Sequence, residues 1–169
     1  MSWSAIKGIK LTLALLIAAL LQGVYAESLT IFGARPDILL AILIIAGLNS
    51  DTNNGAAYGF YAGLMHASLA APPRNGFGSL IVSRTVIGFL AGWFENKVER
   101  HHPLIVLGFV TLGTLLTELL FFVLSPQRTP FHWFRNVCLT TLYNAVLAIP
   151  LFYAIRFLVG KSDDGVSRL

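Results

Sequence analysis

Charged side chains are scarce in this sequence. Asp, Glu, Lys and Arg make up 12 % of the 169 residues and hydrophobic residues make up 56 %, whereas a soluble globular domain carries about 25 % charged residues. We therefore expect residues 1–169 to form a single integral membrane domain. The net charge of +4 comes from basic residues that stand singly near the ends of apolar segments. That distribution suits membrane lipid head groups and argues against a nucleic-acid partner.

Cysteine and catalytic motifs are also lacking. The one cysteine, Cys138, lies in an apolar segment, which excludes a disulfide framework and a cysteine-based metal site. The sequence has no His-Glu-x-x-His, no Gly-x-Ser-x-Gly and no glycine-rich phosphate loop. The adjacent pair His101-His102 would point apart on a helix, with no third ligand nearby. We therefore expect no enzyme: no catalytic residue, no metal and no cofactor. The missing motifs argue against an intramembrane enzyme acting on lipid.

Long apolar segments are abundant by contrast. The hydrocarbon core of a membrane is ~30 Å thick, and about six segments are apolar enough to cross it, which predicts an all-α fold, a polytopic membrane bundle of about six transmembrane helices. The expected spans cover residues 11–26, 31–48, 54–71, 77–94, 103–124 and 133–159. The first resembles a signal peptide, but five apolar segments follow it and favour a retained helix. The excess of Lys and Arg on one side of the spans predicts that both termini are cytoplasmic.

Glycines recur at every fourth residue in the third span. In lipid, small residues at this spacing let helix backbones approach closely, so we interpret this segment as the central helix of the bundle. In the fourth span, two glycines share a face with Arg84. What the glycine stripe packs against, a helix of this chain or of a partner, stays open. The predicted helix-packing or partner-packing residues are Gly55, Gly59, Gly63, Gly88 and Gly92.

Ionisable and amide side chains at membrane depth are costly and by default indicate function. Glu118 shares a helix face with Thr111 and Thr114, and Asn144 shares one with Asn136, so these polar stripes should face each other. We expect Arg84 or His66 to lie near Glu118. The predicted intramembrane polar network consists of Asp37, His66, Arg84, Glu118 and Asn144.

Each of these residues also has a structural interpretation. Asp37 suits the start of a helix at the membrane interface, and His66 suits a hydrogen-bonded packing group. Arg84 is close enough to a span end to extend its guanidinium to the interface. Glu118 is expected to be the most deeply buried, where an internal structural pair is favoured over proton or substrate handling.

The order of motifs resembles one known family. Arg35-Pro36-Asp37-Ile-Leu-Leu opens the second span, Asn54-Gly-Ala-Ala-Tyr-Gly-Phe-Tyr-Ala-Gly63 opens the third, Gly88-Phe-Leu-Ala-Gly92 ends the fourth, and Leu142-Tyr-Asn144-Ala-Val-Leu-Ala-Ile-Pro150 lies in the sixth. In this order and total length, the sequence resembles the MreD family of bacterial rod-shape-determining membrane proteins. The family commonly has an aspartate three residues after the position of Gly63, where this sequence has His66.

The resemblance implies a fold similar to the substrate-binding S components of vitamin transporters and a location in the bacterial inner (cytoplasmic) membrane. It also implies a non-catalytic scaffold of the cell-elongation complex, which contributes to cell shape and lateral peptidoglycan synthesis. The implied partner is MreC, and through it RodA, its transpeptidase partner and MreB. The alternative function is a small-molecule binding or transport subunit resembling an S component. A polar cavity would favour this alternative, and a closed core of mutually satisfied polar groups would favour the scaffold.

Overall fold

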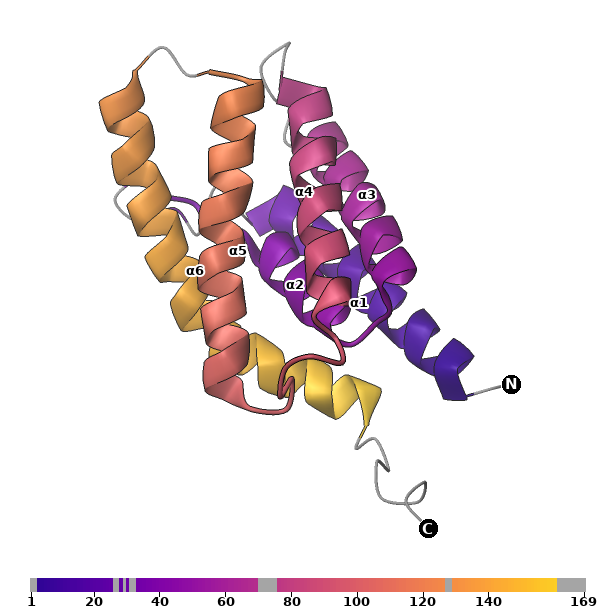
Figure 1. Ribbon diagram of the computed structural model, residues 1–169. Helices are drawn as coiled ribbons and strands as arrows, with labels where there is room; N and C mark the ends of the chain where they lie inside the picture. The colour runs from indigo at the N-terminus through magenta and orange to yellow at the C-terminus, as the bar shows by residue number, and fades with distance from the viewer. Residues whose placement is uncertain are drawn as a thin grey trace.

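The computed structural model of the protein describes residues 3–25, 28, 30, 33–69, 76–126 and 129–160. Six α-helices account for most of this described part (Figure 1), so the predicted all-α fold is confirmed. By length and composition, α1, α4, α5 and α6 could each cross a membrane. The bounds of the helices are α1 Trp3–Tyr25, α2 Ile38–Leu48, α3 Thr52–Leu69, α4 Gly76–Trp93, α5 Pro103–Leu124 and α6 Pro130–Val159.

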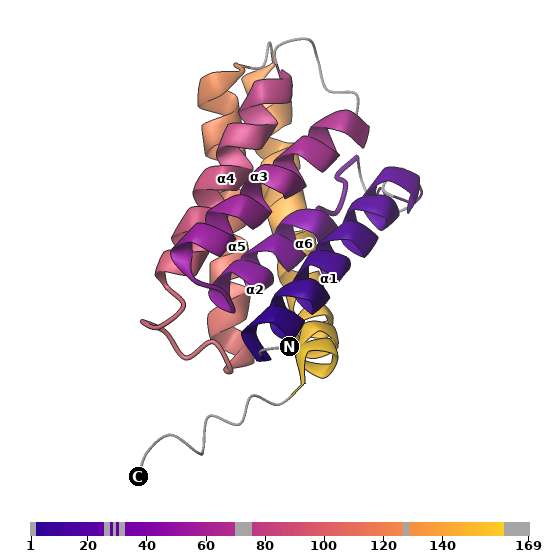
Figure 2. The same ribbon diagram turned by 90° about the vertical axis from the view of Figure 1, so that its right-hand side faces the viewer.

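The short helix α2 lies at the centre of the bundle. It contacts each of the other five helices, and every residue from Leu39 to Leu48 is buried. A helix that is apolar on all sides is stable only when neighbours surround it, and α2 contains no polar side chain. The prediction that the glycine-rich helix is central is therefore wrong. That helix, α3, exposes Phe60 and Tyr61 on its outer side and lies beside α4 (Figure 2).

Several helix bounds differ from the predicted spans. The largest difference is in α2, which begins at Ile38 instead of residue 31 because Asp37 is its N-cap and Pro36 restricts the preceding backbone. α1 begins at Trp3 rather than residue 11, and α6 begins at Pro130, which suits the first turn of a helix. α5 matches its predicted span. The predicted span ends at residues 26, 31–32 and 70–71 lie outside the described residues.

The helices α3 and α4 pack backbone against backbone. A Cβ atom added to Gly59 would lie 2.8 Å from the Cα atom of Thr85, and one added to Gly63 would lie 2.7 Å from the Cα atom of Ile81. Such distances leave no room for any side chain. All five glycines predicted to pack helices lie in this contact or at its edge, where an added Cβ would come within 3.2 Å of the facing backbone: Gly55, Gly59, Gly63, Gly88 and Gly92. The glycine stripe of α3 thus packs against α4 of the same chain.

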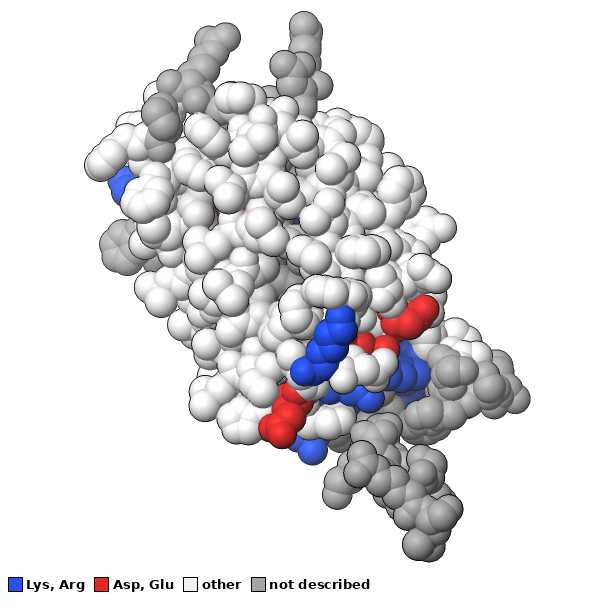
Figure 3. Space-filling view, in the orientation of Figure 1, with Lys and Arg blue, Asp and Glu red and all other residues white. Residues whose placement is uncertain are grey.

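The outer surface is largely apolar. Figure 3 shows charged side chains gathered at the lower end of the molecule, and most of the face above them is uncharged. Every helix except α2 exposes large apolar side chains among the described residues, with Phe157 exposed by 91 %. The connection between α4 and α5 carries Glu95, Lys97, Glu99 and Arg100. An uncharged surface above a charged end is what a protein embedded in lipid requires.

Candidate functional site

Buried polar side chains from several helices meet at the start of α2. Asp37 precedes the helix, and its Oδ1 atom accepts a hydrogen bond from the backbone N–H of Leu40 at 2.9 Å. This is the usual bond of an N-cap aspartate, which satisfies one of the free amides of the first turn. The predicted place of Asp37 at the start of a helix is confirmed, whereas its predicted place at the membrane interface stays a prediction. Unlike an exposed cap, however, Asp37 is 8 % exposed.

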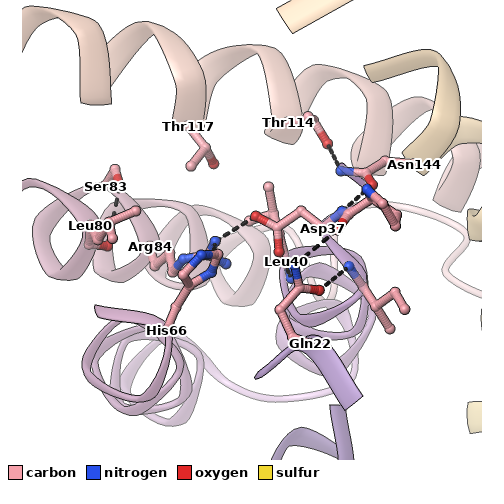
Figure 4. Close-up of polar contacts among 12 residues, drawn as sticks. Gln22, Asp37, Leu40, His66, Leu80, Ser83, Arg84, Thr114, Thr117 and Asn144 are labelled. Atoms are coloured by element: carbon pink, nitrogen blue, oxygen red, sulfur yellow. Dashed lines mark hydrogen bonds and ion pairs between the residues drawn. The ribbon is translucent and has the colours of Figure 1, made fainter. Parts of the chain in front are cut away.

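The second carboxylate oxygen of Asp37 forms a buried ion pair. The Nη2 atom of Arg84 donates to Asp37 Oδ2 at 2.5 Å and also lies 2.6 Å from Nδ1 of His66. Because a guanidinium only donates hydrogen bonds, Nδ1 of His66 must be the acceptor in this contact. Arg84 is 1 % exposed, so its guanidinium is enclosed by protein and does not extend to the surface of the molecule. Side chains from α3 and α4 thus meet at the start of α2 (Figure 4).

The helices α5 and α6 reach the same point through Asn144. Its Oδ1 atom accepts a hydrogen bond from the backbone N–H of Asp37 at 2.8 Å, and its Nδ2 atom donates to Oγ1 of Thr114 at 3.1 Å. Asn144 and Thr114 are both 0 % exposed. An amide that bridges three segments in a dry interior specifies their relative positions, because each broken bond would leave a buried polar group unpaired. The predicted polar stripes of α5 and α6 do face each other here.

Sequence reasoning missed the contribution of α1. Gln22 donates from Nε2 to the carbonyl oxygen of Pro36 at 2.9 Å, and its Oε1 atom accepts from the N–H of Ile38 at 3.0 Å. The signal was present, because Gln22 is the one amide side chain in an otherwise apolar segment. With Gln22, all five other helices supply a side chain to the segment around Asp37. We call this set the α2 hub: Gln22, Asp37, His66, Arg84, Thr114 and Asn144.

Glu118 lies apart from these bonds. The structure places it near Asp37 and Arg84, within electrostatic range, and it lines a cavity together with His66. In the described part of the chain, however, Arg84 pairs with Asp37 and not with Glu118. Glu118 is only half-buried, so the expectation that it is the most deeply buried ionisable residue is wrong. Arg84 holds that position, with its Nη2 atom bonded to Asp37 and His66 and its Nε and Nη1 atoms without a partner in the described part of the chain.

Two cavities flank Glu118. One has a volume of about 270 Å³ and extends from Glu118 past His66 and Asp37 to the end of α1. The other, of about 390 Å³, lies between the segment before α2 and the facing parts of α5 and α6. Arg35, Glu118 and Thr140 line both cavities, so the two are neighbours. Polar side chains line much of each wall, in contrast to the apolar exterior.

Among the described residues, no group of three or more His, Cys, Asp or Glu side chains is placed to hold a metal ion. Comparisons of the chain with protein-family models, with curated proteins and with solved structures found no match.

Proposed function

We propose that this protein is a non-catalytic, multi-pass scaffold of the bacterial cell-elongation complex, of the kind represented by the MreD family. The observation that carries the proposal is the α2 hub. Its ionisable and amide side chains bond mainly to one another, which is what a structural role requires. A catalytic or transport role would direct them toward a bound substrate. The order of the Arg35-Pro36-Asp37, glycine and Asn144 motifs supports the same family.

In this proposal, all six helices take part in crossing the cytoplasmic membrane. The helix α2, with 11 residues, is about 16 Å long, which is about half of the hydrocarbon core. The extended residues before it would complete the crossing, and non-helical backbone is tolerated at that depth where protein encloses it. Ala34, Pro36 and Asp37 in this segment are all buried. The start of α1 and the end of α6 lie at the same end of the bundle (Figure 1), which supports an even number of crossings with both termini on one side of the membrane.

The scaffold would contact its partners through the outward faces of its helices. The glycine stripe is closed by the contact between α3 and α4, so it is not available to a partner helix. The exposed apolar side chains of α1, α5 and α6 remain, and a transmembrane helix can pack against such faces. The proposed partner is the single-span protein MreC, and through it RodA, the transpeptidase and MreB.

A pull-down of the tagged protein in mild detergent, followed by mass spectrometry, tests this function. We expect recovery of an MreC-like single-span protein together with cell-wall polymerases. Recovery of neither would contradict the scaffold. As a control, an unrelated six-span protein carrying the same tag should recover none of these partners.

One observation favours a second function, a small-molecule binding or transport subunit. The larger cavity beside Glu118 has the size of a small ligand site, and both cavities have a mixed polar lining. For a transport subunit resembling an S component, the same pull-down would instead recover a pair of cytoplasmic ATPases.

A further inference from the structure

The two cavities beside Glu118 contain polar groups that the fold does not use. In the described part of the chain, the Glu118 carboxylate forms no hydrogen bond and no ion pair. The buried Nε1 atom of Trp133 and the buried Oδ1 atom of Asn136 also have no hydrogen-bond partner there. Both of these residues line the larger cavity together with Glu118. Buried polar atoms without partners are rare in proteins and call for an explanation.

In the α2 hub, by contrast, every residue has at least one hydrogen-bond partner, although the Nε and Nη1 atoms of Arg84 have none in the described part of the chain. Trp133 is held in place by Phe122, with the two rings stacked at a centroid distance of 4.3 Å. Asn136 lies one turn further along the same face of α6. An indole N–H only donates, an amide oxygen only accepts, and an ionised carboxylate only accepts. The larger cavity is therefore lined by residues that hold one unpaired donor, one unpaired acceptor and a carboxylate that is negatively charged when ionised.

We propose that the two cavities form one binding site for a small molecule that carries a protonated amine and an oxygen acceptor. The amine binds to Glu118, because a charge-assisted hydrogen bond is the strongest contact that a carboxylate can make. An oxygen of the ligand accepts from the indole N–H of Trp133, and a hydroxyl or second N–H of the ligand donates to Asn136. Arg35 also lines both cavities, so a guanidinium as well as a carboxylate borders the proposed site.

Phosphoethanolamine derivatives have this chemistry, since they join an amine to phosphate oxygens over a few atoms. They occur as the head group of a phospholipid and as soluble molecules, and the cavities would suit either source. This inference rests on the second function proposed above. It can fail while the scaffold function holds, because partner recovery and ligand binding are measured separately.

The test has two arms, both on the full-length protein in phosphatidylglycerol nanodiscs. In the first arm, phosphatidylethanolamine is added to the nanodiscs and the lipid retained by the protein is measured by native mass spectrometry. In the second arm, soluble glycerophosphoethanolamine is titrated into the nanodiscs and binding is measured by calorimetry. Retention of the lipid alone assigns the site to a head group, and binding of the soluble compound assigns it to a free ligand. Failure of both probes to bind overturns the proposal.

Variants locate the site. Glu118→Gln should weaken binding by at least about tenfold, because it removes a charged hydrogen bond. Trp133→Phe should weaken it several-fold, because the ring that stacks on Phe122 is kept and only the donor is lost. Glu99→Gln, at the exposed connection between α4 and α5, is the matched control and should bind like the natural protein. Equal binding by all three variants overturns the proposal. If Glu118→Gln fails to fold by its thermal unfolding curve, Trp133→Phe alone decides.

Discussion

Asp37 uses its two carboxylate oxygens for different purposes. One oxygen caps α2 by accepting from Leu40, and the other pairs with Arg84. Its backbone N–H is in turn held by Asn144. Removing one member of a buried ion pair is costly because the other member keeps its charge without a partner. The cap and the ion pair can be separated by substitution, since asparagine caps helices about as well as aspartate.

Asp37→Asn should therefore lose the ion pair and keep the cap. We expect it to destabilise the protein by about 3–5 kcal/mol and Asp37→Ala to cost about 1 kcal/mol more because the cap is lost too. Thermal unfolding in detergent measures both. The control is Glu95→Gln, which breaks the pair between Glu95 and Arg100 at the charged end of the molecule and should cost less than Asp37→Asn, because both of its side chains are 17 % exposed.

A double substitution separates the charge effect from lost packing. Asp37→Asn combined with Arg84→Leu removes both charges, so the combined cost should be smaller than the sum of the two single costs. Simple additivity of the two costs would show that the ion pair does not couple these residues.

The sequence predicted which residues would lie inside the bundle better than it predicted their partners. Four of the five expected network residues do meet: Asp37, His66, Arg84 and Asn144. Helical periodicity places a side chain on a face, but the partner depends on which helix lies opposite and at what height. Glu118 faces the interior of the bundle as expected. Because α2 starts at the level of Arg84, however, Arg84 pairs with Asp37 and not with Glu118.

At the scale of helices, the contact between α3 and α4 depends on the absence of side chains. A methyl group at Gly59 would overlap the backbone of α4, so the helices would have to move apart and lose contacts along their whole length. A methyl group at Gly108 of α5 would meet no heavy atom within 4 Å. These two glycines form a matched pair for substitution.

Gly59→Ala should destabilise the protein by about 1–3 kcal/mol, the usual cost of overfilling a packed contact. Gly108→Ala should leave stability unchanged or raise it by up to about 1 kcal/mol, because alanine favours the helix more than glycine does. Unfolding temperatures in one detergent compare the two variants directly. Equal unfolding temperatures would mean that α3 and α4 are not packed as the structure has them.

Close packing of a helix could be predicted from the sequence more reliably than its position at the centre of the bundle. The recurrence of glycine at every fourth residue of α3 predicted close packing against another helix, and α3 does pack closely against α4. It did not indicate centrality, because a glycine stripe needs one neighbour only. The better signal for the centre was the segment Ile38–Leu48, in which no polar side chain interrupts the apolar residues. Such a helix has no face for water and needs protein on all sides.

For the whole molecule, the arrangement of charges and chain ends predicts a topology. The connection between α4 and α5 lies at the same end of the bundle as the start of α1 (Figure 1), and the connection between α5 and α6 lies at the opposite end. If the proposed orientation holds, the first connection faces the cytoplasm. The charge bias of the sequence agrees with this orientation.

Single cysteines introduced after Cys138→Ser test this topology. Glu99→Cys should react with a membrane-impermeant thiol reagent only when the membrane is opened, and Thr129→Cys should react in intact cells. Both positions are exposed in the structure, so the difference reports the side of the membrane. The reverse pattern would invert the proposed orientation, and equal labelling of both positions would contradict an odd number of crossings between them.

The hydrogen bond between Asp37 and Asn144 joins residues 107 positions apart. Because α2 is synthesised well before α6, the backbone N–H of Asp37 has no acceptor until α6 has been made. In a chain that stops before residue 144, this backbone N–H would have no acceptor in the interior of the bundle, close to Arg84. The polar contacts at the start of α2 are therefore complete only after α6 has packed against it.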